Sequence, residues 1–149
     1  MKTLFQWLGI ETADSTPAAP DTNLAAAALM VEIMAADDEW DDAETSRIKQ
    51  LLVSVLQLPE HEVGELFAAA RQTQREAHDL FHLTSVINEH YQPEQKYALL
   101  KALWQVAYAD GHLDRYEEHM IRKLADLLYL THTQFIQAKL EAEAEAQAR

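Results

Sequence analysis

The chain has 149 residues, no cysteine and a formal net charge of −13. This length is enough to bury a hydrophobic core without disulfide or metal staples, and the lack of cysteine excludes thiolate metal sites and thiol chemistry. The excess of 25 acidic over 12 basic residues argues against a nucleic-acid partner, because neutralising phosphates requires clustered Lys and Arg. Cations and basic protein surfaces are the partners that this charge favours.

The composition also predicts the fold class. Only three glycines and four prolines interrupt a sequence rich in Ala, Leu, Glu and Gln, so we predict an all-α protein. No apolar run reaches the roughly 18 to 20 residues that span a bilayer, and the first residues make a poor secretion signal. We therefore expect a soluble, cytoplasmic protein with no transmembrane segment.

The N-terminal residues form a separate segment. Residues 1–10 are amphipathic, with apolar side chains at Leu4, Phe5, Trp7, Leu8 and Ile10. This segment either docks on the domain or stays loose, or it anchors the protein to a partner or a membrane surface. Residues 11–23 have the Ser, Thr, Pro and Asp content of a linker, so we place the helical domain at residues 24–149.

The first predicted helix runs from residue 24 to about residue 36, and Thr22 and Asn23 are its candidate caps. Glu32 interrupts the apolar sequence of this helix. Its carboxylate lies either on the solvent face or inside the protein with a partner that keeps it charged. Glu32 is therefore a secondary site candidate.

A second helix is predicted to begin at a capping box formed by Asp41 and Glu44, and Pro59 separates it from a third. In a capping box the side chains of the first and fourth residues each accept a hydrogen bond from the other's backbone N–H. The first repeat of the fold then covers residues 24–76. A connecting helix is predicted at about residues 79–91.

The fifth predicted helix begins at Pro93 and carries Leu103 and Trp104 into the core. The sixth begins at a capping box of Asp114 and Glu117. The seventh begins at Thr131-x-x-Gln134 and is expected to direct Phe135, Ile136 and Leu140 inward. Its Glu-Ala end at residues 141–149 has little apolar surface to bury, so we expect a solvated, fraying tail with no role.

The chain reads as an internal duplication with an offset of 73 residues. The offset pairs apolar residues with apolar residues and acids with acids. Residues 93–140 form the second repeat, and we predict that the first three helices superpose on the last three. The paired positions are Met30 with Leu103, Ile33 with Val106, Asp37 with Asp110, Asp41 with Asp114 and Glu44 with Glu117.

We call residues 36–44 and 109–117 the two acidic turns. These turns resemble those of a known family, as do the Asn88-Glu89-His90 segment and the stretch from Leu100 to Trp104 that leads into Ala109-Asp110-Gly111. Over about residues 24–140 it resembles the TerB-like family, tellurite-resistance protein B. The resemblance implies a compact all-helical fold, a part in stress-linked tellurite resistance, no catalysis, and a metal site at the acidic turns. By position, its ligands are Asp37, Asp41, Glu44, Asp110, Asp114 and Glu117, with Asp38 and His112 as secondary candidates.

Oxygen ligands suit Ca²⁺, Mg²⁺ or Mn²⁺, and His112 extends the choice toward Zn²⁺. The spacing is not that of an EF-hand, because residues 110–117 are too few for its twelve-residue loop. We recognise no catalytic constellation and hypothesise a non-catalytic, stress-associated protein that binds a divalent metal ion. The alternative is a metal-free acidic module that docks a basic protein partner.

A purely structural role is the competing interpretation of these acids. Helix caps stabilise a protein by about 1 kcal/mol each, which by itself accounts for Asp41, Glu44, Asp114 and Glu117. Asp37 and Asp110 are different because they follow predicted helix C-termini, where the helix dipole disfavours an anion by about 0.3 to 1 kcal/mol. Their placement favours a functional role.

Overall fold

The structure is a computed structural model, and it describes residues 22–35, 42–76, 80–109 and 113–148. In these residues the chain forms seven α-helices and no strand, which confirms the all-α prediction. The described helices include none that is long and apolar enough to cross a membrane. The helices are α2 (Thr22–Ala35), α3 (Asp42–Leu56), α4 (Glu60–Glu76), α5 (Leu80–His90), α6 (Pro93–Ala107), α7 (Arg115–Leu127) and α8 (His132–Ala148).

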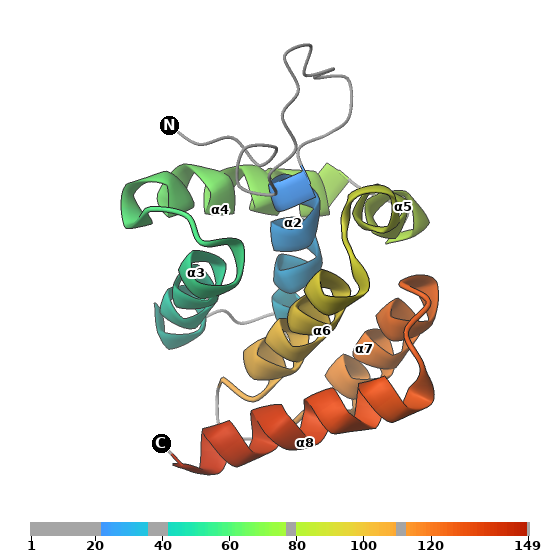
Figure 1. Ribbon diagram of the computed structural model, residues 1–149. Helices are drawn as coiled ribbons and strands as arrows, with labels where there is room; N and C mark the ends of the chain where they lie inside the picture. The colour runs from blue at the N-terminus through green and yellow to red at the C-terminus, as the bar shows by residue number, and fades with distance from the viewer. Residues whose placement is uncertain (1–21, 36–41, 77–79, 110–112, 149) are drawn as a thin grey trace.

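Helix α2 lies at the centre of the molecule, with α3, α4, α5 and α6 around it (Figure 1). From Leu24 to Ala35 all its residues except Glu32 are apolar, and a helix of that kind is stable only when it is enclosed. Leu29, Met30 and Ile33 are fully buried. Glu32 is partly buried, between the two positions that the sequence leaves open.

The predicted start of this helix is two residues too late. Thr22 and Asn23 lie inside the first turn of α2 and are buried. The Thr22 hydroxyl has no hydrogen-bond partner, so it does not cap the helix. A Thr hydroxyl can hydrogen-bond either backward or forward along the chain, and the sequence alone does not fix which residue begins a helix.

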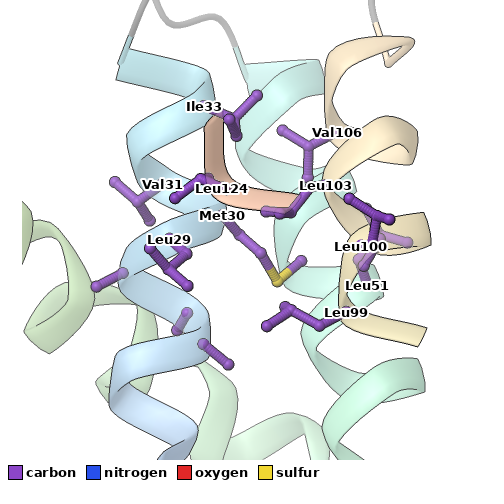
Figure 2. Close-up of a cluster of buried hydrophobic side chains, with 14 of the residues drawn as sticks. Leu29, Met30, Val31, Ile33, Leu51, Leu99, Leu100, Leu103, Val106 and Leu124 are labelled. Atoms are coloured by element: carbon purple, nitrogen blue, oxygen red, sulfur yellow. The ribbon is translucent and has the colours of Figure 1, made fainter. Parts of the chain in front are cut away.

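Helices α2 and α6 run in the same direction and pack against each other, as both views show (Figures 1 and 2). Figure 2 shows Ile33 and Val106, which the 73-residue offset pairs, at one end of this contact. Met30 extends from α2 toward Leu99 of α6. Leu103 and Trp104 are fully buried, as predicted.

The two repeats share further features. The first helix of each repeat packs extensively on the third, α2 on α4 and α6 on α8. The starts of α2, α3 and α4 lie within two residues of the 73-residue offset from the starts of α6, α7 and α8. After α3 and α7 the chain turns through a non-glycine residue with positive φ, Gln57 at 55° and Tyr129 at 60°. The superposition of the repeats stays a prediction that this pattern favours.

The end of α7 is held by backbone and side-chain hydrogen bonds. The N–H of Leu130 donates to the carbonyl of Ala125 at 3.0 Å and that of Tyr129 to Asp126 at 3.0 Å. This pattern ends a helix through a residue in the left-handed region. The Asn88 side chain of α5 donates to the Leu127 carbonyl at 3.0 Å, so a polar residue of the connecting helix caps α7.

The prediction for the last helix is wrong in two respects. Its Glu-Ala end does not fray but continues as helix to Ala148, with Ala142 fully buried. Leu140 points outward and is 57% exposed, whereas Ala138 faces the core. Helix α8 lies across α6 (Figure 1), and small alanines on the contact face let the two helices approach closely.

Candidate functional site

The described part of the second acidic turn is the start of α7. Asp114 has extended backbone angles and its Oδ1 accepts a hydrogen bond from the Tyr116 N–H at 3.1 Å. Glu117 Oε1 accepts one from the Asp114 N–H at 3.3 Å. The predicted capping box is therefore confirmed. A cap of this kind stabilises the protein by about 1 kcal/mol.

The two carboxylates of this capping box differ in exposure. Asp114 is exposed, whereas Glu117 is 6% exposed. A buried carboxylate is stable only when its oxygens accept hydrogen bonds or meet a positive charge. The backbone of Asp114 supplies one such hydrogen bond to Glu117. Both side chains offer carboxylate oxygens, which are possible metal ligands, at the N-terminus of α7. The helix dipole makes this a favourable place for negative charge.

The other predicted ligands are not placed. Asp37, Asp38, Asp41, Asp110 and His112 lie outside the described residues, as does the side chain of Glu44. The ligand set therefore stays a prediction. Within the described residues no group of three or more His, Asp or Glu side chains is arranged to hold a metal ion.

What the structure does place are the helices that lead into both acidic turns. Because α2 and α6 run in the same direction, Ala35 and Ala107, their last residues, lie at the same end of the domain (Figures 1 and 2). The chain enters the two turns from this end. The opposite arrangement, with the two turns leaving from opposite ends of the helical core, is excluded by this packing.

The densest group of described polar contacts joins α6 to the Glu-Ala end of α8. The Tyr97 hydroxyl donates to Glu141 at 2.9 Å and the Tyr108 hydroxyl donates to Glu143 at 3.1 Å. Glu141 and Glu143 are two positions apart, about 200° around a helix, so they leave opposite flanks of α8. Since α8 lies across α6, one flank reaches the start of α6 and the other reaches its end.

Four more contacts extend this group. Glu145 accepts a hydrogen bond from Gln105 at 2.6 Å and forms an ion pair with Lys101. Lys139 pairs with Glu118 at 3.3 Å and lies 5.6 Å from the centre of the Trp104 ring. Most of these side chains are partly exposed, so each contact contributes little, but together they fix the position of α8.

The tyrosines show the electrostatic effect of these contacts. Burial, followed by the hydrogen bond and the charge of Glu141, raises the pKa of Tyr97 from 10.0 to about 12. Burial, the hydrogen bond and charge of Glu143, and the charge of Glu118 likewise raise the pKa of Tyr108 to about 12. Both phenols are therefore protonated donors throughout the physiological range.

Sequence reasoning missed this group entirely. A weak signal was present, because Tyr97, Lys101, Gln105 and Tyr108 recur every three or four residues and so share one face of a helix. Such a polar stripe is usually solvated. Only the packing of α8 shows that glutamates from a distant part of the chain cover it.

A hollow of about 510 Å³ lies between α3 and α4. It is lined by Ser46, Lys49, Gln50, Val53, Glu60, Val63 and Gly64. The lining combines one ammonium group and one carboxylate with amide, hydroxyl and apolar side chains. This mixture points to no particular reaction.

Comparison with protein families gives one match. The family model described as Tellurite resistance protein TerB matches residues 23–140, which is most of the chain. The chain belongs to the TerB family. Comparison with curated proteins and with solved structures gives no match.

The TerB match confirms the resemblance seen in the acidic turns and gives a boundary within α8. It covers α2 to α7 and the first half of α8, and ends at Leu140. The glutamates that bind α6 follow directly after this point. Residues 141–148, which follow the matched range, continue α8 without a break and pack against α6.

Proposed function

We propose that this TerB protein is non-catalytic and stress-associated, and that it binds a divalent cation at the acidic turns that follow α2 and α6. The ligands of the proposed site are Asp37, Asp41, Glu44, Asp110, Asp114 and Glu117. Their oxygens suit Ca²⁺, Mg²⁺ or Mn²⁺, and His112 would add the nitrogen donor that Zn²⁺ favours. The family match supports the tellurite-resistance context.

The observation that carries the proposal is the parallel packing of α2 and α6. This packing brings the C-terminal ends of α2 and α6 to the same end of the domain, so both acidic turns begin there. Two carboxylates about 6 Å apart repel by roughly 0.7 kcal/mol in water and by nearer 3 kcal/mol at an effective dielectric of 20. A bound cation removes that cost, and capping alone does not.

Capping and cation binding are compatible at Asp114. A carboxylate has two oxygens and about four lone-pair sites, and the described cap uses Oδ1 for the Tyr116 N–H. The exposure of Asp114 also leaves this side chain accessible to an ion from solution. The cap fixes the direction of the carboxylate and so lowers the entropy that binding would cost.

The two roles are separated by substitutions that keep the cap and remove the charge. Asn caps a helix about as well as Asp, and Gln replaces Glu in a capping box. The variant Asp114→Asn, Glu117→Gln should therefore unfold at nearly the same temperature as the wild type without metal. In millimolar Ca²⁺, Mg²⁺, Mn²⁺ or Zn²⁺ the wild type should gain stability and the variant should gain much less, because a ligand selective for the folded state raises its stability.

The matched control is Asp114→Ala, which removes both the cap and the charge and should be destabilised by about 1 kcal/mol without metal. Thermal unfolding with and without each ion provides the measurement. If no ion shifts the wild-type midpoint, or if the shift is equal in the Asn and Gln variant, the metal proposal is wrong. A metal-free acidic module that docks a basic protein then takes its place, with the net charge of −13 as its support.

A further inference from the structure

The hollow between α3 and α4 is lined by one face of each helix. On α3 the lining residues recur at helical spacing between Ser46 and Val53, and on α4 they lie in the first turns, between Glu60 and Gly64. The volume of about 510 Å³ lies within the range of about 300 to 1,000 Å³ in which proteins bind small molecules. The hollow is therefore large enough for a ligand.

Two opposite charges line this hollow. The Lys49 ammonium extends from α3 to α4, where it lies 5.4 Å from the centre of the Phe67 ring. Glu60 is exposed in the first turn of α4. Neither side chain takes part in the ion pairs among the described residues. The hollow therefore offers one cation and one anion to a ligand.

Gly64 is an independent observation at the same place. A glycine within a helix destabilises it relative to alanine, and one physical reason for a glycine is the close approach of another group to the backbone. In the described structure nothing outside the helix's own backbone comes within 4 Å of the position that a Cβ of Gly64 would occupy. The packing of the fold therefore does not require glycine here, whereas a ligand against the backbone of α4 would.

The spacing of these groups sets the length of the ligand. Glu60 and Phe67 are seven residues apart on α4, about 10 Å along the helix axis, and Gly64 lies between them. Opposite charges pair at about 3 Å, so a ligand that meets both charges carries its own about 5 to 10 Å apart. An extended peptide spans about 3.5 Å per residue, so the two ends of a di- or tripeptide match this distance.

We propose that the hollow between α3 and α4 binds a short zwitterionic peptide of two or three residues. The carboxylate of the peptide pairs with Lys49, its ammonium group pairs with Glu60, and its backbone lies against Gly64. The hydroxyl and amide side chains in the lining of α3 can hydrogen-bond its peptide groups, and the two valines of the lining contact its side chains. The proposal does not depend on metal binding at the acidic turns.

Trialanine is the probe, and shifts of the amide NMR signals of the isotope-labelled full chain measure its binding. Because Lys49 and Glu60 are exposed, we expect a dissociation constant of about 0.1 to 1 mM. N-acetylated trialanine and C-amidated trialanine each lack one charge and should bind roughly 3- to 10-fold more weakly. Free alanine should also bind more weakly than trialanine, because both of its charged groups are attached to one carbon.

Gly64→Ala separates binding from folding. Alanine is the better helix former and has room for its methyl group, so the variant should unfold at a higher temperature than the wild type. The same methyl group occupies space that the peptide backbone needs, so trialanine should bind about threefold or more weakly. The matched control is Ser54→Ala, at an exposed position of α3 outside the lining. It should bind trialanine as the wild type does.

The direction of the bound peptide is tested by removing one charge of the protein at a time. Lys49→Gln should bind trialanine roughly 3- to 10-fold more weakly and should no longer distinguish it from the C-amidated form. Glu60→Gln should no longer distinguish trialanine from the N-acetylated form. Each variant should keep its preference against the other blocked peptide. Circular dichroism checks that all variants are folded.

Three results would overturn the proposal. The first is the absence of a saturable shift in the wild type up to about 20 mM trialanine. The second is equal binding of trialanine and a form that is blocked at both ends, which would indicate an internal segment of a protein as the occupant. The third is a Gly64→Ala variant that binds trialanine as tightly as the wild type.

Discussion

The first and last described helices are held in the fold in opposite ways. Helix α2 is apolar from Leu24 to Ala35 except at Glu32 and is enclosed by its neighbours, so its position depends on non-directional burial. Beyond Leu140 helix α8 alternates Glu with Ala, and this end of the helix is held by buried Ala142 and by side-chain hydrogen bonds to α6. The difference shows that a helix end with little apolar surface is placed largely by directional contacts.

Loss of a large buried side chain at the α2–α6 contact should have the largest effect on stability. Leu103→Ala removes a fully buried side chain and should lower the free energy of unfolding by about 2 to 5 kcal/mol. Urea unfolding provides the measurement. The matched change on α8, Leu140→Ala, should cost less than about 0.5 kcal/mol because that side chain is exposed. Similar losses of unfolding free energy at both positions would contradict the difference in burial between Leu103 and Leu140.

Removal of the Glu-Ala segment should have an intermediate effect. A chain that ends at Leu140 keeps the TerB match but loses buried Ala142 and the contacts of three glutamates. We expect a loss of about 1 to 3 kcal/mol, because each partly exposed hydrogen bond contributes only modestly. A chain that ends at Glu145 keeps these contacts and should be nearly as stable as the full chain. Equal stability of all three would show that the segment is not part of the folded domain.

Alkaline pH should weaken the α6–α8 contact and leave the packing of α2 unchanged. The folded state raises the pKa of Tyr97 and of Tyr108 from 10.0 to about 12, so it binds these protons more tightly than the unfolded state. The stabilisation is fully present below the unfolded pKa of 10.0 and is lost as pH rises through about 12.

The double variant Tyr97→Phe, Tyr108→Phe isolates this effect. Its unfolding free energy should fall less steeply than that of the wild type across this alkaline range, in urea titrations at several pH values. Tyr116→Phe, at an exposed position, is the control and should behave as the wild type does. A double variant with the wild-type slope would mean that the phenols titrate alike in the folded and unfolded states.

The smallest effect concerns the turn into α8 and its counterpart before α4. A left-handed backbone conformation costs a non-glycine residue roughly 1 to 2 kcal/mol. Glycine avoids this cost, but its larger conformational entropy in the unfolded state offsets part of the gain in stability. Gln57→Gly should therefore stabilise the protein by about 0.5 to 1 kcal/mol. Tyr129→Gly should gain less, because the Tyr129 ring lies 5.7 Å from the Lys96 ammonium. Differential scanning calorimetry compares the two; a larger gain at Tyr129 would mean that the Lys96 contact contributes nothing.

The sequence predicted the fold class, the number of main helices and most of their boundaries. These follow from local chemistry: Pro93 begins α6, Asp114 with Glu117 caps α7, and Thr131 with Gln134 caps α8. Burial of Leu103 and Trp104 also followed from helical periodicity. For the candidate site, the sequence named six acids, and of these the structure places Asp114 and Glu117 as a capping box and leaves the convergence of the set to experiment.

Tertiary structure decided which faces of the helices meet. Local patterns could not show that Leu140 points outward, because the apolar pattern of α8 alone favours burying it. The packing of Phe135, Ala138 and Ala142 into the core leaves Leu140 outside. The same orientation brings Glu141 and Glu143 to the hydroxyls of Tyr97 and Tyr108, more than thirty residues away. Periodicity describes one helix at a time, whereas hydrogen bonds between helices form only when two distant segments are packed together.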